Sequence, residues 1–118
     1  MAAMVATTGV AQASPAGVAG GNYGECGVLP VSDNCYIEAP GFPGGTVMVD
    51  VDVIPSPGGE DFENHFDLTA PGQIGLCRAQ FKAGAPNWTW WCERVNAGTL
   101  QLNVRKRDNE AVKMAIRW

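Results

Sequence analysis

Four carboxylates near the middle of the chain are the first side chains whose type and spacing could support chemistry. Asp50 and Asp52 share one face of a predicted strand, and Glu60 and Asp61 follow in the next loop. Carboxylates of this kind can bind calcium, and a pair of them can hydrolyse a glycosidic bond. The chain contains no D-x-D-x-D-G calcium loop. A solvated strand face followed by a polar loop is therefore the preferred interpretation, and calcium binding stays open as the alternative.

Other catalytic groups are scarce in this sequence. His65 is the single histidine, and no G-x-S-x-G motif marks a nucleophilic serine. The four cysteines are separated by 9, 42 and 15 positions without a C-x-x-C pair, which is not the spacing of a zinc site. The pairs Gly44-Gly45 and Gly58-Gly59 lie in Pro-rich turns and do not form a phosphate loop. We therefore expect no enzyme activity, no metal, no cofactor and no small-molecule substrate.

The even number of cysteines favours a disulfide framework in an oxidising compartment. Four cysteines allow three connectivities, and the pairing of sequence neighbours predicts Cys26 with Cys35 and Cys77 with Cys92. The second pair follows from two predicted strands, 74–82 and 88–95, on either side of a Gly- and Pro-containing turn. We expect these strands to form a hairpin in which Cys77 faces Cys92.

Three tryptophans immediately precede the last cysteine. Because side chains alternate between the faces of a strand, Trp88 and Trp90 are expected in the core with Cys92. Trp91 then points to the opposite face, where the predicted hairpin also places Arg78. There Trp91 could stack with Arg78 or serve as a binding anchor. The alternative is that a second sheet covers that face.

The remaining segments alternate in the same way and are separated by turns rich in Gly and Pro. Six or seven short strands of this kind predict an all-β fold, a small antiparallel β-sandwich or barrel stapled by two disulfides. The predicted strands are 34–39, 46–54, 65–70, 74–82, 88–95, 99–106 and 111–118.

The N-terminal 23 residues carry no charge. Ala11-Gln12-Ala13 is an A-x-A cleavage pattern, so residues 1–13 are interpreted as a signal-peptide remnant whose basic n-region is missing. Residues 14–23 are expected to be a flexible Ala/Gly-rich segment, and residues 24–118 a single β domain, as the length of 118 residues allows. This organisation predicts a secreted protein.

Charge is distributed unevenly along the chain. The formal net charge is −4, and all eight Lys and Arg follow Cys77. This composition argues against nucleic-acid binding, and no apolar run is long enough to span a membrane. The most basic tract, Arg105, Lys106 and Arg107, is expected at a hairpin tip. It could contact an acidic partner, although a solvated turn that discourages edge-to-edge aggregation is preferred.

The preferred interpretation of the loop between the first two cysteines is that its disulfide ties the N-terminal segment to the sandwich, and the alternative is a binding loop. A disulfide would preorganise its apolar residues for insertion into a partner's cleft, because less entropy is then lost on binding. We therefore predict a secreted protein-binding module whose partner is another extracellular protein, first of all an inhibitor of an extracellular enzyme. One alternative is an adaptor subunit that engages its partner through residues 14–23, and another is a carbohydrate-binding module that uses Trp91. The partner-binding candidates are Val28, Leu29, Pro30, Val31, Arg78, Trp91, Arg105, Lys106 and Arg107.

Overall fold

The computed structural model describes residues 4–8, 20–28, 34–86, 88–107 and 109–118, and all regular structure in these segments is β-strand. None of the described residues forms a helix that could cross a membrane. The strands are β1 (Met4–Thr8), β2 (Gly21–Cys26), β3 (Asn34–Phe42), β4 (Gly45–Ile54), β5 (Glu63–Ala70), β6 (Gln73–Lys82), β7 (Trp88–Val95), β8 (Gly98–Arg105) and β9 (Ala111–Arg117).

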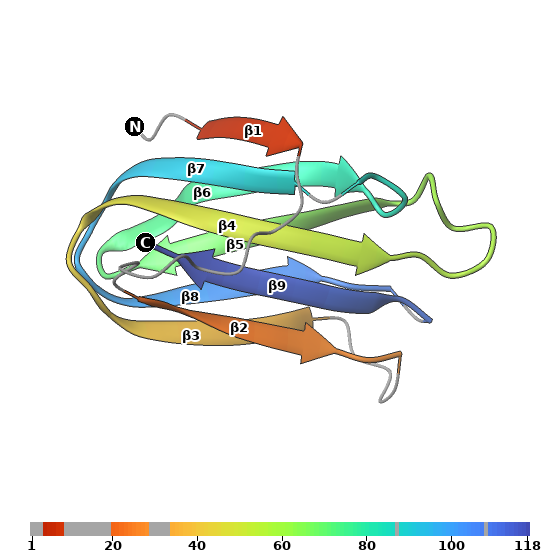
Figure 1. Cartoon of the computed structure of the whole chain (residues 1–118), viewed down its shortest axis with the longest axis horizontal. Coiled ribbons are helices and arrows are strands. Elements are labelled where there is room, and N and C mark those ends of the chain that lie inside the picture. Colours follow the sequence, from red (N-terminus) through yellow and green to blue (C-terminus); the bar gives the residue numbers. More distant parts are fainter. Residues whose placement is uncertain (1–3, 9–19, 29–33, 87, 108) are drawn as a thin grey trace.

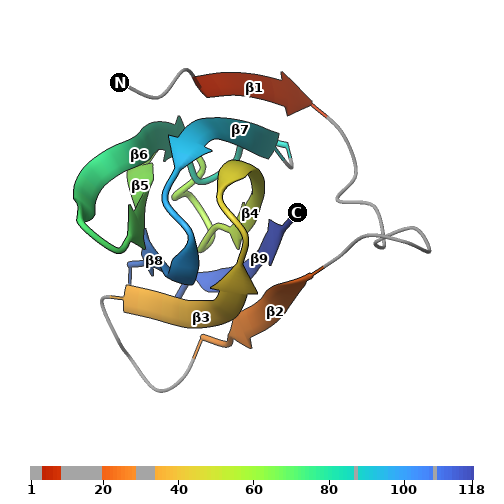
Figure 2. The same cartoon turned by 90° about the vertical axis from the view of Figure 1, so that its left-hand side faces the viewer.

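The strands form two antiparallel sheets packed face to face (Figures 1 and 2). One sheet has the order β1-β7-β4-β9-β2, and the other has the order β3-β8-β5-β6. The predicted all-β sandwich is thus confirmed. Two described strands, β1 and β2, were not predicted as strands. They lie at the two edges of the larger sheet, and their sequences lack the alternation of large apolar residues that marks the others.

The core consists of the inward-facing residues of both sheets. In β4 the valines at alternate positions are buried as predicted, and the same alternation buries one face of β8 and of β9. Each strand contributes residues from one face only, because successive side chains point to opposite sides of a sheet. The residues concerned are Val47, Val49, Val51, Val53, Leu100, Leu102, Val104, Val112, Met114 and Ile116.

Both predicted disulfides are present, Cys26–Cys35 and Cys77–Cys92. Each bridge joins the two sheets: the first connects β2 to β3, and the second connects β6 to β7. The bridges therefore link the two sheets at opposite sides of the sandwich.

The hairpin predicted for residues 74–95 is wrong. β6 pairs with β5, whereas β7 pairs with β4 and β1, so the turn between β6 and β7 crosses from one sheet to the other. Alternation identifies the apolar face of each strand, but two such faces can lie side by side or face to face. Packing them face to face buries Cys77 and Cys92 almost completely, and area removed from water stabilises that arrangement.

Removing the bridge between β6 and β7 is expected to cost measurable stability. In the chain-entropy description a bridge that closes 15 residues stabilises a protein by about 3 kcal/mol. The double substitution Cys77→Ala/Cys92→Ala should therefore shift a urea transition to lower concentration by that free energy. The matched variant Cys26→Ala/Cys35→Ala opens a loop of 9 residues and should cost roughly half a kcal/mol less. A larger loss for the second variant would contradict this reasoning.

Candidate functional site

A cleft of about 440 Å³ opens at one end of the sandwich. It lies where the loop between β4 and β5 meets the end of β6, the turn that follows it and the start of β7. Its volume lies in the range of ligand-binding sites in proteins. The lining residues are Glu60, Asp61, Gln80, Phe81, Lys82, Gly84, Ala85, Trp88 and Trp90.

Backbone hydrogen bonds hold the two walls of the cleft together. The Gly84 amide donates to the Glu60 carbonyl at 2.9 Å, and the Ala83 amide donates to the Phe62 carbonyl at 2.9 Å. A Cβ atom at position 84 would lie 2.7 Å from the Glu60 Cβ and 3.0 Å from the Glu60 carbonyl oxygen. Glycine therefore permits the loop to approach the turn, and any larger residue would push the walls apart.

Aromatic side chains form the floor of the cleft. Trp90 is only 5% exposed, and its ring centroid lies 5.1 Å from that of Phe66 in the core. The rings of Phe81 and Trp88 lie 5.5 Å and 6.2 Å from that of Trp90, and both are half-buried. Trp90 thus anchors the floor in the core, whereas Phe81 and Trp88 present part of their ring surface to the cleft.

Polar side chains form the rim. Glu60, Asp61, Gln80 and Lys82 are all exposed, and the Lys82 Nζ lies 3.6 Å from an Asp61 carboxylate oxygen. An exposed ion pair of this kind contributes little to stability. These groups can therefore exchange their contacts with water, or with one another, for contacts with a ligand.

The outer face of the larger sheet carries a buried ion pair. The Arg117 guanidinium donates to Asp50 at 2.5 Å and 3.0 Å, and the Thr89 hydroxyl donates to the same carboxylate at 2.5 Å. These hydrogen bonds raise the pKa of Arg117, against the opposing effect of its burial. Asp50 is 4% exposed, and Asp52 lies opposite Lys113 on β9. The first two residues of the acidic cluster thus face basic side chains.

The calcium alternative gains no support from this arrangement. Within the described residues, no three His, Cys, Asp or Glu side chains come together in a way that could hold a metal ion. Asp50 and Asp52 lie on the outer sheet face, whereas Glu60 and Asp61 line the cleft. The sequence places these four residues close in number, but the fold assigns them to two different surfaces.

Trp91 is exposed, and its predicted contact with Arg78 is wrong. Trp91 lies on the outer face of the larger sheet and is 41% exposed. Arg78 lies on β6 in the other sheet, where its Nε atom is 2.5 Å from a carboxylate oxygen of Asp67. The two side chains are separated because β6 and β7 belong to different sheets.

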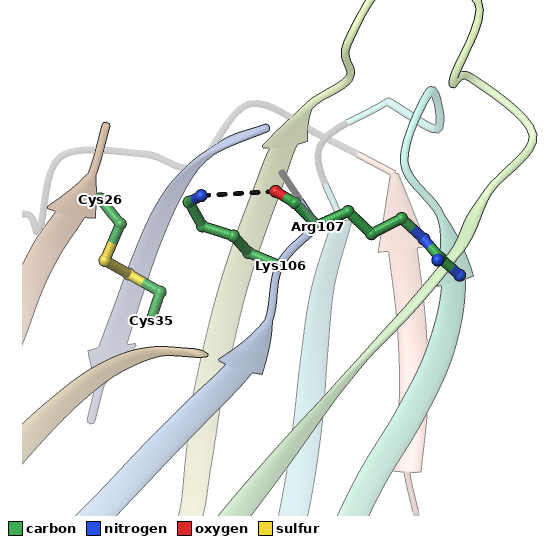
Figure 3. Close-up of a disulfide and its surroundings, with 4 residues drawn as sticks. All are labelled: Cys26, Cys35, Lys106 and Arg107. Carbon is green, nitrogen blue, oxygen red and sulfur yellow. Dashed lines mark hydrogen bonds between the residues drawn. A yellow bond between two sulfur atoms is a disulfide. The ribbon is translucent and has the colours of Figure 1, made fainter. Parts of the chain in front are cut away.

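The basic tract is not the solvated hairpin tip that the sequence predicts. Lys106 is only 2% exposed, and its Nζ donates to the Arg107 carbonyl at 3.3 Å (Figure 3). Figure 3 shows its side chain on the side of the Cys26–Cys35 bridge, while that of Arg107 runs the opposite way. Because its side chain is buried, Lys106 offers no accessible surface to a partner. Arg105 and Arg107 remain exposed.

Arg107 makes contacts within the chain through both its side chain and its backbone. Its guanidinium lies over the Phe62 ring, 4.9 Å from the centroid, and donates to the Glu63 carbonyl at 3.2 Å. Its backbone amide donates to the fully buried Glu110 at 2.6 Å, and Glu110 also accepts from Asn64 at 2.9 Å. These contacts fix the turn after β8 against the start of β5.

Of the apolar loop predicted to enter a partner, only Val28 belongs to the described residues. It is 41% exposed, while Leu29, Pro30 and Val31 lie outside the described residues. The cleft itself was not predicted from the sequence. Its clearest signal is that few residues separate Phe81, next to the last residue of one strand, from Trp88, the first residue of the following strand.

Neither a protein-family model nor a curated protein sequence matches this chain. Among solved structures, the CBM36-1 domain of a multidomain xylanase from the hindgut metagenome of Trinervitermes trinervoides is 10% identical. That comparison covers 97% of this chain and 96% of that chain, with a TM-score of 0.46. The C-terminal CBM6 of LamC, a marine laminarinase from Zobellia galactanivorans, is 14% identical over 98% of this chain and 100% of that chain, with a TM-score of 0.45.

A third similar structure is a de novo designed double-stranded β-helix, which is 13% identical over 82% of this chain and 95% of that chain, with a TM-score of 0.42. Because the identities are this low and these TM-scores lie below 0.5, none of the three similarities assigns the chain to a family. Its function has to be inferred from its own residues.

Proposed function

We propose that this protein is a secreted, non-catalytic module that binds carbohydrate in the cleft lined by Phe81, Trp88 and the polar rim, here called the Trp88 cleft. The observation that carries the proposal is the combination of two partly exposed aromatic rings with four exposed polar side chains in one cleft of about 440 Å³. The two disulfides are typical of proteins from an oxidising, extracellular compartment.

The chemistry of a sugar ring suits both parts of the cleft. A pyranose presents C–H groups on its faces and hydroxyl groups around its edge. The C–H face can pack on an aromatic ring, which offers a large apolar surface of fixed shape. The hydroxyl groups both donate and accept hydrogen bonds, and the rim offers both kinds of partner. Carboxylates accept, the Lys82 ammonium donates, and the Gln80 amide does either.

This cleft is a different surface from the one around Trp91 that the sequence predicts for a carbohydrate. Trp91 lies on the face of a sheet, outside the cleft. Trp88 is less exposed than Trp91, but its ring lines a cleft in which other groups converge. Convergence of a few polar groups on an apolar surface is what fixes a small ligand. The inhibitor hypothesis stays a prediction, because most of its loop lies outside the described residues.

Trp88→Ala is expected to weaken carbohydrate binding at least tenfold. Removal of an aromatic residue at the centre of a binding site typically costs more than about 1–2 kcal/mol, and 1.4 kcal/mol corresponds to a factor of ten. A glycan array would first identify a ligand for the unsubstituted protein. Calorimetric titration with that ligand would then give the dissociation constants of the protein and the variant.

Two matched variants keep this test decisive. Trp91→Ala removes a tryptophan from the outer face and should leave carbohydrate affinity unchanged. Gln80→Ala removes an exposed rim amide with little effect on the core, and should weaken binding without lowering the melting temperature. The proposal would be overturned if the array gave no ligand, or if Trp88→Ala and Gln80→Ala both bound as tightly as the unsubstituted protein.

A further inference from the structure

Strand β1 lies beyond the strands that the two disulfides link. One bridge joins the edge strands β2 and β3, and the other joins β6, an edge strand, to β7. Without β1, β7 would itself be the edge of its sheet, and strands β2 to β9 would form a sandwich bridged at both sides. Both views show β1 beyond β7 (Figures 1 and 2).

A single neighbour holds β1 in its sheet. Its five residues pair antiparallel with β7 from Met4 opposite Cys92 to Thr8 opposite Trp88, and among the described strands β7 is its one hydrogen-bonded neighbour. The segment also falls within residues 1–13, which the A-x-A pattern predicts to be removed on export. Loss or displacement of β1 would leave the backbone N–H and C=O groups along that side of β7 unpaired.

The edge beneath β1 lacks the usual protection against pairing. Natural edge strands are blunted by charged side chains, proline, bulges or short length. The paired segment of β7, Trp88–Cys92, has no charged residue and no proline. Trp91, which lies on the outer face of this segment, is 41% exposed. An edge of this kind is a template for another strand.

We propose that β7, when β1 is absent, pairs with β7 of a second copy of this chain. The two strands run antiparallel about a two-fold axis at Trp90, so that Trp90 lies opposite the partner's Trp90 and Thr89 lies opposite the partner's Trp91. This register keeps every side chain on its present face of the sheet, because opposite residues share a face. It replaces β1 by a strand of the same antiparallel orientation.

A second copy suits this edge for two reasons. A two-fold interface requires a surface that is complementary to itself, and the uncharged segment Trp88–Cys92, paired antiparallel with its own copy, sets no like charges opposite each other. The two Trp91 side chains become diagonal neighbours on the outer face, within reach of one another. Because the paired segment is short, the interface falls at the small, weak end of the range, and we expect a dissociation constant of roughly 10–100 µM.

The test compares association with and without β1. Consecutive residues of a strand direct their N–H groups to opposite sides, so one of any two neighbouring residues in β1 points its N–H group toward β7. The full-length variant Val5→Pro/Ala6→Pro therefore removes a backbone donor that faces β7 and disrupts β1. A chain beginning at Ser14 lacks β1 altogether. Sedimentation velocity from about 1 to about 300 µM should show a monomer for the unsubstituted full-length chain and a concentration-dependent dimer for both altered proteins.

Two lysine substitutions in the proline variant identify the interface. Trp91→Lys places two ammonium groups at diagonal positions and should raise the dissociation constant at least tenfold. Ile74→Lys adds the same charge to β6, the edge of the other sheet, at a residue that is 88% exposed, and should leave the dimer unchanged. The proposal is overturned if both proteins without β1 stay monomeric, if the full-length chain dimerises equally, or if Trp91→Lys leaves the dimer intact.

Circular dichroism separates loss of fold from loss of pairing in each variant. If the chain beginning at Ser14 fails to fold, the full-length proline variant decides the question alone. The readout is molecular mass, so the outcome does not depend on whether the Trp88 cleft binds carbohydrate.

Discussion

Trp90→Ala is expected to lower the free energy of unfolding by about 3–5 kcal/mol, the range found for large aromatic residues removed from protein cores. Trp90 is nearly buried, and its ring packs edge-on against Phe66 and at an angle against Phe81. Cys92, two positions further along the same strand, forms the bridge to β6. Truncation would leave a cavity between the sheets and remove the support of the Trp88 cleft.

The matched control is the adjacent tryptophan. Trp91→Ala removes the same side chain from the outer face, where it is 41% exposed, and should cost less than about 1 kcal/mol because little buried surface is lost. Urea titrations of both variants measure the two free energies. Equal losses of unfolding free energy would mean that Trp91 is packed as tightly as Trp90. That result would contradict the placement of Trp91 on an exposed face.

Arg117→Met is expected to cost a similar amount, about 3–5 kcal/mol, because it leaves a buried carboxylate without its cation. Asp50 is 4% exposed and receives two hydrogen bonds from Arg117. After the substitution the hydrogen bond from Thr89 remains, but one hydroxyl group cannot replace a guanidinium. The loss should appear as a lower urea midpoint at neutral pH.

Two comparisons separate charge from packing at this site. The double variant Asp50→Leu/Arg117→Met removes both charges and should recover a large part of the lost stability, since an apolar pair can replace a buried ion pair at little cost. Arg78→Met breaks the ion pair with Asp67, in which the arginine side chain is 62% exposed, and should cost less than about 1 kcal/mol. A double variant as unstable as Arg117→Met would show that packing, and not the unpaired charge, dominates.

Features that depend on one strand at a time could be predicted from the sequence. Val47 and Val49 are buried, and Trp90 and Trp91 face opposite ways, as alternation predicts. The reason is geometric, because a strand with one buried face must repeat its apolar residues every second position whatever its neighbours are. The disulfide pairs were also predicted correctly, by joining cysteines that are neighbours in the sequence.

The partners of each strand were decided only by the tertiary structure. Cys77 and Cys92 are joined as predicted, but across two sheets and not across a hairpin. Alternation is identical in both arrangements, so it cannot choose between them. The choice depends on the total apolar area that all the strands bury together, a sum over the whole chain.

The same reason explains the cleft and the buried lysine. Glu60 and Gly84 lie far apart in the sequence and meet only because the loop after β4 packs on the turn after β6. Lys106 looks like a solvated charge between two arginines, yet it is 2% exposed. The charge and spacing of a residue are local properties of the chain. Its exposure and its neighbours depend on which elements pack beside it, and that is settled only when both sheets are assembled.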